Sequence, residues 1–300
     1  MSLPKLPAGA AYLFLNNASR RNALSLEVLQ DLSSQLKRHF TSPKSKELLT
    51  LPPFYHKHLK RLQEAKEYRW LFDPSEWRNE CRNMPSVLVL RSQGPVFSSG
   101  HDLKEVSEMS EAERKELFKT CAEVMSLIRS SPAVVVGAVQ GLATAAGFQL
   151  AMTCDVTIAR ASTEFQLPGM SIGLPCTSPS TAASRRIPVG LAYRMYATAQ
   201  RVRADELGGA IDVVKSSEED AFERRVAETV SQLVGMPGQP QALGKWAFWS
   251  QSGMAASGKL DGFTRATTWS SDAMVMHAGN SEAAEGMSAF LEKRKPKWSI

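Results

Sequence analysis

Short apolar runs alternate with amphipathic stretches along the first two thirds of the chain. The runs are rich in Val, Leu, Ile and Ala, as is typical of buried strands, and they cover residues 13–15, 87–90, 133–139 and 156–159. Apolar residues recur at helical spacing between the runs, at 26–40 and 111–129. This order predicts an α/β fold whose strands pair in parallel through right-handed crossovers.

The pattern after Pro188 is mostly helical. Residues 191–200, 204–211 and 218–234 show helical spacing, and so does the end of the chain. These helices either pack on their own core or reach a neighbouring subunit, and the pattern leaves both alternatives open.

About 40 residues after Phe40 form a separate, proline-punctuated segment with a basic stretch, YHKHLKRLQEAKEYRWLF, that predicts an amphipathic helix. Five of its side chains could contact an acidic partner, an anionic membrane surface or RNA: His56, Lys57, His58, Lys60 and Arg61. We expect a solvated helix face instead, because no RNA-binding signature with interleaved aromatics accompanies the charges.

Composition narrows the class of protein. The 300 residues are 43% hydrophobic and 22% charged, as in ordinary folded domains. The longest apolar stretch, 133–139, is far shorter than the roughly 20 residues of a membrane-spanning helix, so no transmembrane segment is expected. The N-terminal residues fit neither a secretory signal nor an Arg-rich transit peptide well, which leaves the compartment open.

The cysteines lie far apart and form no C-x-x-C pair: Cys81, Cys121, Cys154 and Cys176. This spacing favours reduced thiols in an intracellular protein over a disulfide framework or a zinc site. The net charge of +6 favours a polyanionic partner, which a nucleic acid, an anionic membrane face or a phosphate-bearing ligand would each satisfy. We expect no DNA partner.

Candidate chemistry lies in two segments that follow predicted strands, GPVFSSGHDLKEV (94–106) and QGLATAAGFQL (140–150). Ligands of open α/β sheets gather at the carboxyl ends of the strands. Small residues there let backbone N–H groups point at an anionic oxygen, and two such donors about 3 Å from a thioester oxygen would form an oxyanion hole. Ordinary glycine-rich turns are the alternative.

Four ordered motifs carry a family resemblance: FSSGHDLKE, VVVGAVQGLATAAGFQLAMTCDVTIA, FQLPGMSIGL and EGMSAFLEKRKPKW. They resemble the crotonase, or enoyl-CoA hydratase/isomerase, superfamily, and most of all its branch of enoyl-CoA hydratase domain-containing proteins. The resemblance implies an α/β spiral of ββα repeats over residues 1–190, with a helical insertion at about 41–82. It also implies a C-terminal helical region, 191–300, that assembles a homotrimer or hexamer, and it favours a mitochondrial location over a cytoplasmic one.

By the same resemblance, the ligand is an acyl-CoA thioester, with coenzyme A as part of the substrate and no tightly bound cofactor or metal. The oxyanion donors would be the backbone N–H groups of His101 and Ala146. The family's coenzyme A contacts fall on Ser99, His101, Lys104, Phe290 and Lys293. Taken singly, the two lysines are equally typical of a solvated surface.

The sequence departs from the family at its two catalytic glutamates, which align with Gln149 and Gly169. Neither residue can exchange a proton. Because general acid–base catalysis contributes roughly 10²- to 10⁴-fold, we expect ordinary hydration to be slow. Two hypotheses remain: an acyl-CoA enzyme that stabilises an enolate or oxyanion with backbone groups, and a non-catalytic acyl-CoA-binding or regulatory partner of an active relative.

Two side chains could substitute for the missing acids. Cys176 precedes Ser178-Pro179, a plausible helix start, and a thiol at a helix N-terminus can have a lowered pKa. The His101 imidazole could reach the acyl group. Packing roles are the alternatives for both, and Asp155 is expected to be structural.

Overall fold

A parallel five-stranded sheet, ordered β1-β2-β3-β5-β8, forms the centre of the chain in the computed structural model, which describes residues 3–53, 59–218, 220–252, 262–279 and 281–297. Its strands are β1 (Ala10–Leu15), β2 (Val87–Ser92), β3 (Val134–Val139), β5 (Val156–Arg160) and β8 (Asp212–Val214). The four strands expected from apolar runs and their parallel pairing are confirmed.

A second, smaller sheet consists of three-residue strands: β4 (Leu142–Thr144), β6 (Glu164–Gln166) and β7 (Arg201–Arg203). β4 pairs with β6 in parallel, and β6 with β7 antiparallel. Strands this short hold too few residues to display a period of two, so the sequence pattern gave no sign of them.

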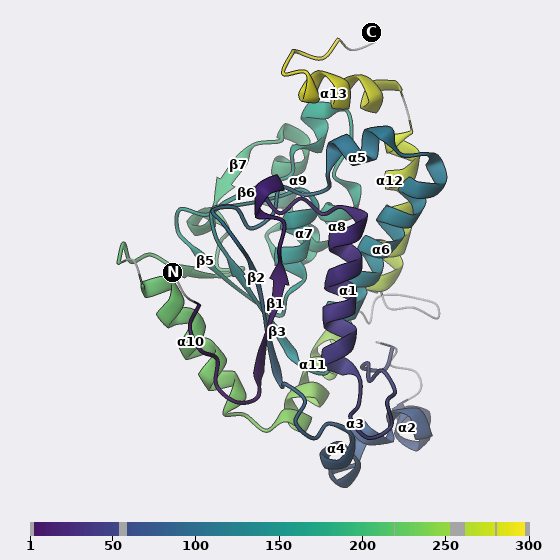
Figure 1. Cartoon of the computed structure of the whole chain (residues 1–300), viewed down its shortest axis with the longest axis vertical. Coiled ribbons are helices and arrows are strands. Elements are labelled where there is room, and N and C mark those ends of the chain that lie inside the picture. Colours follow the sequence, from purple (N-terminus) through teal and green to yellow (C-terminus); the bar gives the residue numbers. More distant parts are fainter. Residues whose placement is uncertain (1–2, 54–58, 219, 253–261, 280, 298–300) are drawn as a thin grey trace.

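Helices cover both faces of the main sheet, as a parallel sheet requires. Successive side chains of β2 point to opposite faces. Val87 and Val89 belong to the apolar cluster that includes α10 (Ala221–Val234), whereas Leu88 and Leu90 belong to the core beneath α1 (Leu26–Phe40) and α6 (Glu111–Ser130). Figure 1 shows α10 on one side of the sheet and α1 on the other.

Side-chain caps set the starts of the two covering helices. The Ser25 hydroxyl accepts a hydrogen bond from the Val28 N–H at the start of α1. At the start of α6, Ser110 and Glu113 form a reciprocal capping box. Each cap satisfies N–H groups that have no acceptor inside the helix, and so fixes the first residue of the helix.

The insertion is helical but is not one helix. It contains α2 (Leu59–Glu64), α3 (Arg69–Phe72) and α4 (Pro74–Glu80), and a single 3₁₀ turn joins the first two. Asp73, whose carboxylate caps α4, is extended because a residue before proline disfavours helical backbone. His56, Lys57 and His58 lie outside the described residues.

Apolar side chains of the insertion pack against α11 (Gly238–Ser252). They form a separate cluster whose buried members are Leu49, Leu51, Trp70, Leu71, Ala242 and Trp246. The Gln239 amide also donates to the Leu71 carbonyl at 2.9 Å. The apolar face of the insertion is therefore covered by the chain's own C-terminal half.

The segment after α8 (Thr177–Arg186) and α9 (Val189–Thr198) differs from its predicted pattern. The expected helix at 204–211 is wrong: a 3₁₀ turn at Ala204–Glu206 leads through Gly208 and Gly209 into β8. Both glycines have positive φ, +64° and +80°, which an α-helix cannot accommodate. A domain boundary near residue 190 stays a prediction.

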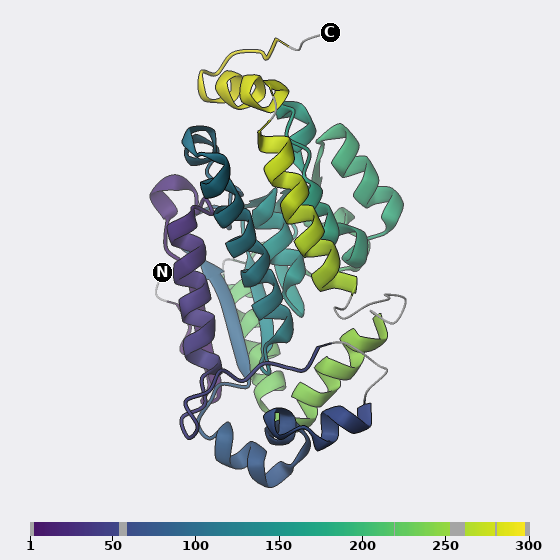
Figure 2. The ribbon, with the colours of Figure 1, turned by 90° about the vertical axis from the view of Figure 1, so that its right-hand side faces the viewer.

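The last helices, α12 (Gly262–Ala278) and α13 (Ser281–Leu291), pack on the chain's own core. α12 lies along α6 and α8, and Figure 2 shows α1, α6 and α12 side by side. α13 contacts α5 (Leu103–Glu108) and the 3₁₀ turn Pro168–Ile172. Within the ranges that the structure describes, no helix combines the length and apolarity needed to cross a membrane.

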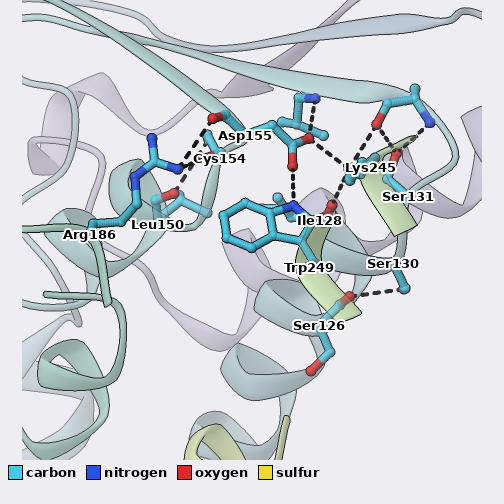
Figure 3. A network of polar contacts seen from close by, with 12 residues as sticks. Ser126, Ile128, Ser130, Ser131, Leu150, Cys154, Asp155, Arg186, Lys245 and Trp249 are labelled. Atoms are coloured by element: carbon cyan, nitrogen blue, oxygen red, sulfur yellow. Dashed lines mark hydrogen bonds and ion pairs between the residues drawn. The ribbon is translucent and has the colours of Figure 1, made fainter. Parts of the chain in front are cut away.

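A mostly buried carboxylate, 11% exposed, joins α11 to the sheet (Figure 3). The Asp155 carboxylate forms an ion pair with the Lys245 ammonium at 2.7 Å. It also accepts hydrogen bonds from the Val135 N–H at 2.8 Å and the Trp249 indole N–H at 3.1 Å. Lys245 also donates to the carbonyls of Ile128 and Ala133, at 3.1 and 2.9 Å. Asp155 thus has specific partners for the structural role that we expected of it.

We expect Lys245→Met to lower the free energy of unfolding by about 3–5 kcal/mol, because it leaves the mostly buried Asp155 charge without its counter-ion. Lys119→Met is the control, since Lys119 forms an exposed pair with Glu123 at 3.9 Å and should change stability by less than about 0.5 kcal/mol. Urea denaturation measures both values. Equal losses would show that the buried pair has no special role.

Candidate functional site

The two loops singled out by their small residues lie against each other. The Ser98 N–H donates to the Leu142 carbonyl at 3.2 Å, and the Thr144 N–H donates to the Ser98 carbonyl at 3.0 Å. The Gly100 carbonyl in turn accepts from the Leu24 N–H at 2.8 Å. The first loop is therefore held between the second loop and the segment that precedes α1.

This contact leaves no room for side chains. A Cβ atom at Gly100, where φ is +81°, would lie 2.8 Å from the Ala145 Cβ and 2.9 Å from the Thr144 carbonyl oxygen. A Cβ atom at Gly147 would lie 2.6 Å from the Ser98 Cβ. Glycine is required at both positions for the backbones to come this close.

The close approach brings two residues with unused backbone N–H groups to one cavity. Ala146 is the first residue of α7 (Ala146–Thr153), so its N–H has no acceptor inside the helix. Among the described residues, neither the Ala146 N–H nor the His101 N–H donates a hydrogen bond to the chain. Both residues line a cavity of about 350 Å³.

The cavity is mainly apolar and has polar groups at a few points. Its apolar lining comes from several elements: Leu103, Val106, Phe118, Leu142, Pro168, Ile172, Leu174, Met274 and Phe290. Two cationic residues, Arg21 and Arg201, also line it, and neither was predicted as a site residue. Arg21 begins the segment RNALS (21–25), which resembles the family's pattern and could have indicated it, whereas nothing in the sequence distinguished Arg201.

The residues predicted to contact coenzyme A do not all line the same hollow. Ser99, His101 and Phe290 line the cavity. Lys104 lies in the first turn of α5 and lines a different, acid-rich hollow of about 610 Å³, and Lys293 is not among the described residues that line the cavity. The five predicted contacts therefore do not meet at one place.

The His101 ring is fixed by two contacts. Its Nδ1 lies 3.1 Å from the Leu24 carbonyl oxygen, and its ring meets that of Phe118 edge-to-face at 5.1 Å. Because a carbonyl oxygen can only accept, Nδ1 carries the proton and Nε2 is an acceptor. Desolvation lowers the pKa of His101 to about 4, so the ring is neutral at physiological pH.

Gln149 is completely buried and is not part of the cavity lining. Its Oε1 accepts a hydrogen bond from the Ser178 hydroxyl at 3.1 Å, and Ser178 does line the cavity. The Gln149 Nε2 atom has no hydrogen-bond partner within the part of the chain that the structure describes. The amide thus reaches the cavity through a serine.

Gly169 and Cys176 lie together on the cavity wall. The Gly169 N–H donates to the Cys176 sulfur at 3.2 Å, and a Cβ atom at Gly169 would lie 2.0 Å from the Leu174 carbonyl oxygen. Only glycine fits there. The backbone in this turn occupies the volume that an acidic side chain would need.

Of the two roles considered for Cys176, the surroundings of the thiol favour packing over a reactive thiol with a lowered pKa. The residue is the N-cap of α8, which begins at Thr177, but burial raises the pKa of its thiol to about 12. Loss of hydration at a buried sulfur outweighs the partial positive charge of the helix end. The thiol is therefore protonated and unreactive at neutral pH.

We expect a pH-dependent stability that arises from His101. An unfolded histidine titrates near pH 6.5, so the unfolded chain takes up a proton before the folded one as the pH falls. The free energy of unfolding should therefore fall between about pH 6.5 and pH 4, by up to about 3 kcal/mol for this group. Urea denaturation across this range should give a shallower decline for His101→Gln, and parallel declines would contradict the assignment.

Comparisons with known proteins agree on one family. The sequence profile of the enoyl-CoA hydratase/isomerase family matches residues 78–299. The mouse (Mus musculus) protein named enoyl-CoA hydratase domain-containing protein 3, mitochondrial, is 33% identical over 97% of this chain and 82% of its own length.

Solved structures agree with the sequence comparison. The crystal structure of human enoyl coenzyme A hydratase domain-containing protein 3 superposes with a TM-score of 0.64 at 30% identity, over 98% of each chain. An enoyl-CoA hydratase from Mycobacterium avium subsp. paratuberculosis has a TM-score of 0.72 at 20% identity, over 99% of this chain and 97% of that one, which supports the fold alone. The chain has the crotonase fold and belongs to the enoyl-CoA hydratase/isomerase family.

Proposed function

We propose that the cavity binds an acyl-CoA thioester and holds its carbonyl oxygen between the His101 and Ala146 N–H groups. The observation that carries the proposal is that two backbone donors without acceptors in the described chain line one cavity. An oxyanion or enolate oxygen is the group that such a pair stabilises best. The first helical residue adds the partial positive charge of a helix N-terminus.

The residues that line the cavity suit both the acyl chain and the phosphates of such a ligand. Their apolar side chains fit an acyl chain, and Arg21 fits a phosphate of coenzyme A, whereas Arg201 is already paired with Glu164 at 2.8 Å. Ser99 and Phe290 are our candidates for further coenzyme A contacts. Lys104 and Lys293, which do not line the cavity, stay candidates for contacts with coenzyme A outside it, and the reaction needs no tightly bound cofactor.

Ordinary hydration is not part of the proposal. An amide at 149 and a glycine at 169 have no proton to exchange, and the Cys176 thiol is protonated. Binding and oxyanion stabilisation rest on backbone groups and are independent of these side chains. The alternative, a non-catalytic partner of an active relative, rests on the same missing acids and differs only in having no turnover.

The location and the assembly are also proposals. The mouse and human relatives carry the word mitochondrial in their names, so we propose a mitochondrial location over a cytoplasmic one, which cell fractionation tests. We propose a homotrimer or hexamer on the family resemblance alone, and light scattering of the purified protein tests the assembly.

We expect Gly100→Ala to weaken binding of acyl-CoA thioesters by about 10-fold or more, because the added methyl group separates the two loops and misaligns one donor. Gly209→Ala is the control: its φ of +80° matches that of Gly100, but nothing lies within 4 Å of its new Cβ. It should change binding less than about twofold. Titration calorimetry measures both variants.

A carbonyl-free analogue separates oxyanion contacts from general affinity. An alkyl-CoA thioether should bind wild-type protein more weakly than the thioester of equal length, because it has no oxygen for the two donors. The difference should disappear in Gly100→Ala. The proposed function is wrong if wild-type protein binds no acyl-CoA thioester.

We expect wild-type protein to hydrate short, medium and long enoyl-CoAs no faster than buffer, because general acid–base groups are absent at 149 and 169. Loss of the enoyl absorbance measures the rate. Hydration well above the buffer rate would require a proton-transfer group that we have not identified. Gly169→Glu is unsuitable as a gain-of-function test, because any Cβ there collides with the Leu174 carbonyl.

A further inference from the structure

His101 has the side chain of the cavity lining that can accept a proton at neutral pH. Among the described residues of the lining there is no aspartate, glutamate, lysine or tyrosine. The arginines stay protonated, and the hydroxyl and amide groups are too weak as bases to take a proton from carbon. The Cys176 thiol is itself protonated. A neutral imidazole, in contrast, has a lone pair on one ring nitrogen.

The surroundings of the ring decide which nitrogen is available. Nδ1 donates to the Leu24 carbonyl oxygen at 3.1 Å. The backbones of Leu24 and His101 also form an isolated parallel β-bridge, which fixes this carbonyl beside the residue that carries the ring. The Phe118 ring, another part of the lining, contacts the imidazole edge-to-face. Nε2 makes no hydrogen bond to a described residue, so its lone pair is left for a ligand.

The charge state of His101 suits a base. Desolvation lowers its pKa to about 4, so the ring is neutral near physiological pH and its lone pair is unprotonated. This pKa is close to that of an ordinary glutamate, about 4.3, and glutamates act as general bases in enzymes. When the ring gains a proton, the Leu24 carbonyl still accepts from Nδ1, and this bond favours the charged ring.

On the basis of the proposed function, we propose that His101 Nε2 is the base that removes a proton from the α-carbon of the bound acyl-CoA. The α-carbon is two bonds from the carbonyl oxygen that the His101 N–H holds, so one residue serves both atoms. Nε2 takes the proton, the C–H electron pair forms a carbon–carbon double bond, and the carbonyl electrons move onto oxygen. The two backbone donors stabilise this enolate oxygen, and return of a proton from Nε2 to the carbon restores the thioester.

This assignment limits both the substrate and the reaction. The acyl group must carry a hydrogen on its α-carbon, and the step is a reversible exchange of that hydrogen with solvent through Nε2. Hydration of an enoyl-CoA also needs a group that activates water at the β-carbon, and Gln149 and Gly169 provide none. The expected absence of hydration therefore stands.

Butanoyl-CoA incubated with the protein in heavy water tests the role of His101, because each exchange adds deuterium at the α-carbon, which mass spectrometry detects. With saturating ligand, wild-type protein should exchange the α-protons at least about 10²-fold faster than a protein-free sample, the lower range of general-base catalysis. His101→Asn should lower this rate by about 10²-fold. Its dissociation constant, measured by titration calorimetry, should stay within about threefold of the wild-type value.

His101→Asn keeps the other contacts of the residue and removes the base. The backbone N–H is unchanged, and the amide nitrogen can take the place of Nδ1 and donate to the Leu24 carbonyl. No atom of asparagine takes the place of Nε2. If this variant does not fold, His101→Gln provides the second test, because its longer amide fills more of the volume of the ring and is also too weak a base.

His39→Asn is the matched control. His39 is partly buried near the end of α1, and desolvation lowers its pKa too, but it is not among the described residues that line the cavity. Its exchange rate and its affinity should equal those of wild-type protein.

The outcomes separate the two proposals. Binding of butanoyl-CoA without exchange above the protein-free rate, or unchanged exchange in His101→Asn, would overturn the role of His101 while the proposed function stands. A loss of exchange in His39→Asn as large as that in His101→Asn would also overturn that role. Absence of binding to wild-type protein would instead overturn the proposed function.

Discussion

The contact between the two small-residue loops is the constraint on which the rest of the site depends. The loops exchange backbone hydrogen bonds through Ser98. They lie so close together that neither Gly100 nor Gly147 could carry a Cβ atom. Because the backbones meet directly, His101 and Ala146 line one cavity, and the two donors that we propose there belong to the main chain. A donor that belongs to the main chain does not change its charge with pH, and rotamer choice cannot move it.

Burial determines the character of the side chains around these donors. It lowers the pKa of His101, raises that of Cys176 and encloses the Gln149 amide completely. The His101 ring and the Cys176 thiol on the cavity wall are therefore neutral near physiological pH, and the charged residues of the lining are Arg21 and Arg201, of which Arg201 is paired with Glu164 at 2.8 Å. Such a site can recognise and polarise a ligand more readily than it can transfer a proton to it.

The sequence predicted the main sheet well because its strands are continuous apolar runs, and it predicted α1 and α6 because their apolar faces follow the helical period. The prediction from sequence failed where a strand was too short to show a pattern, and where glycines outweighed an apparent helical spacing. β4, β6 and β7 have three residues each, and the glycines at 208 and 209 turned an apparent helix into a turn and a strand. The two loops of the site were found from their glycines, whereas the alternative of a reactive Cys176 considered the helix end and not desolvation. Arg201 and the Ser178–Gln149 hydrogen bond depend on tertiary contacts between distant segments, which no local pattern encodes.

The cluster that the insertion shares with α11 has a consequence for biosynthesis. Trp70 and Leu71 are buried against residues that follow them by about 170 positions, as the bond from Gln239 to Leu71 illustrates. A ribosome adds residues in order, so these apolar side chains leave the exit tunnel long before their partners exist. During that interval Trp70 and Leu71 have no partner to cover them, and the insertion can complete its apolar cluster only after α11 has been made.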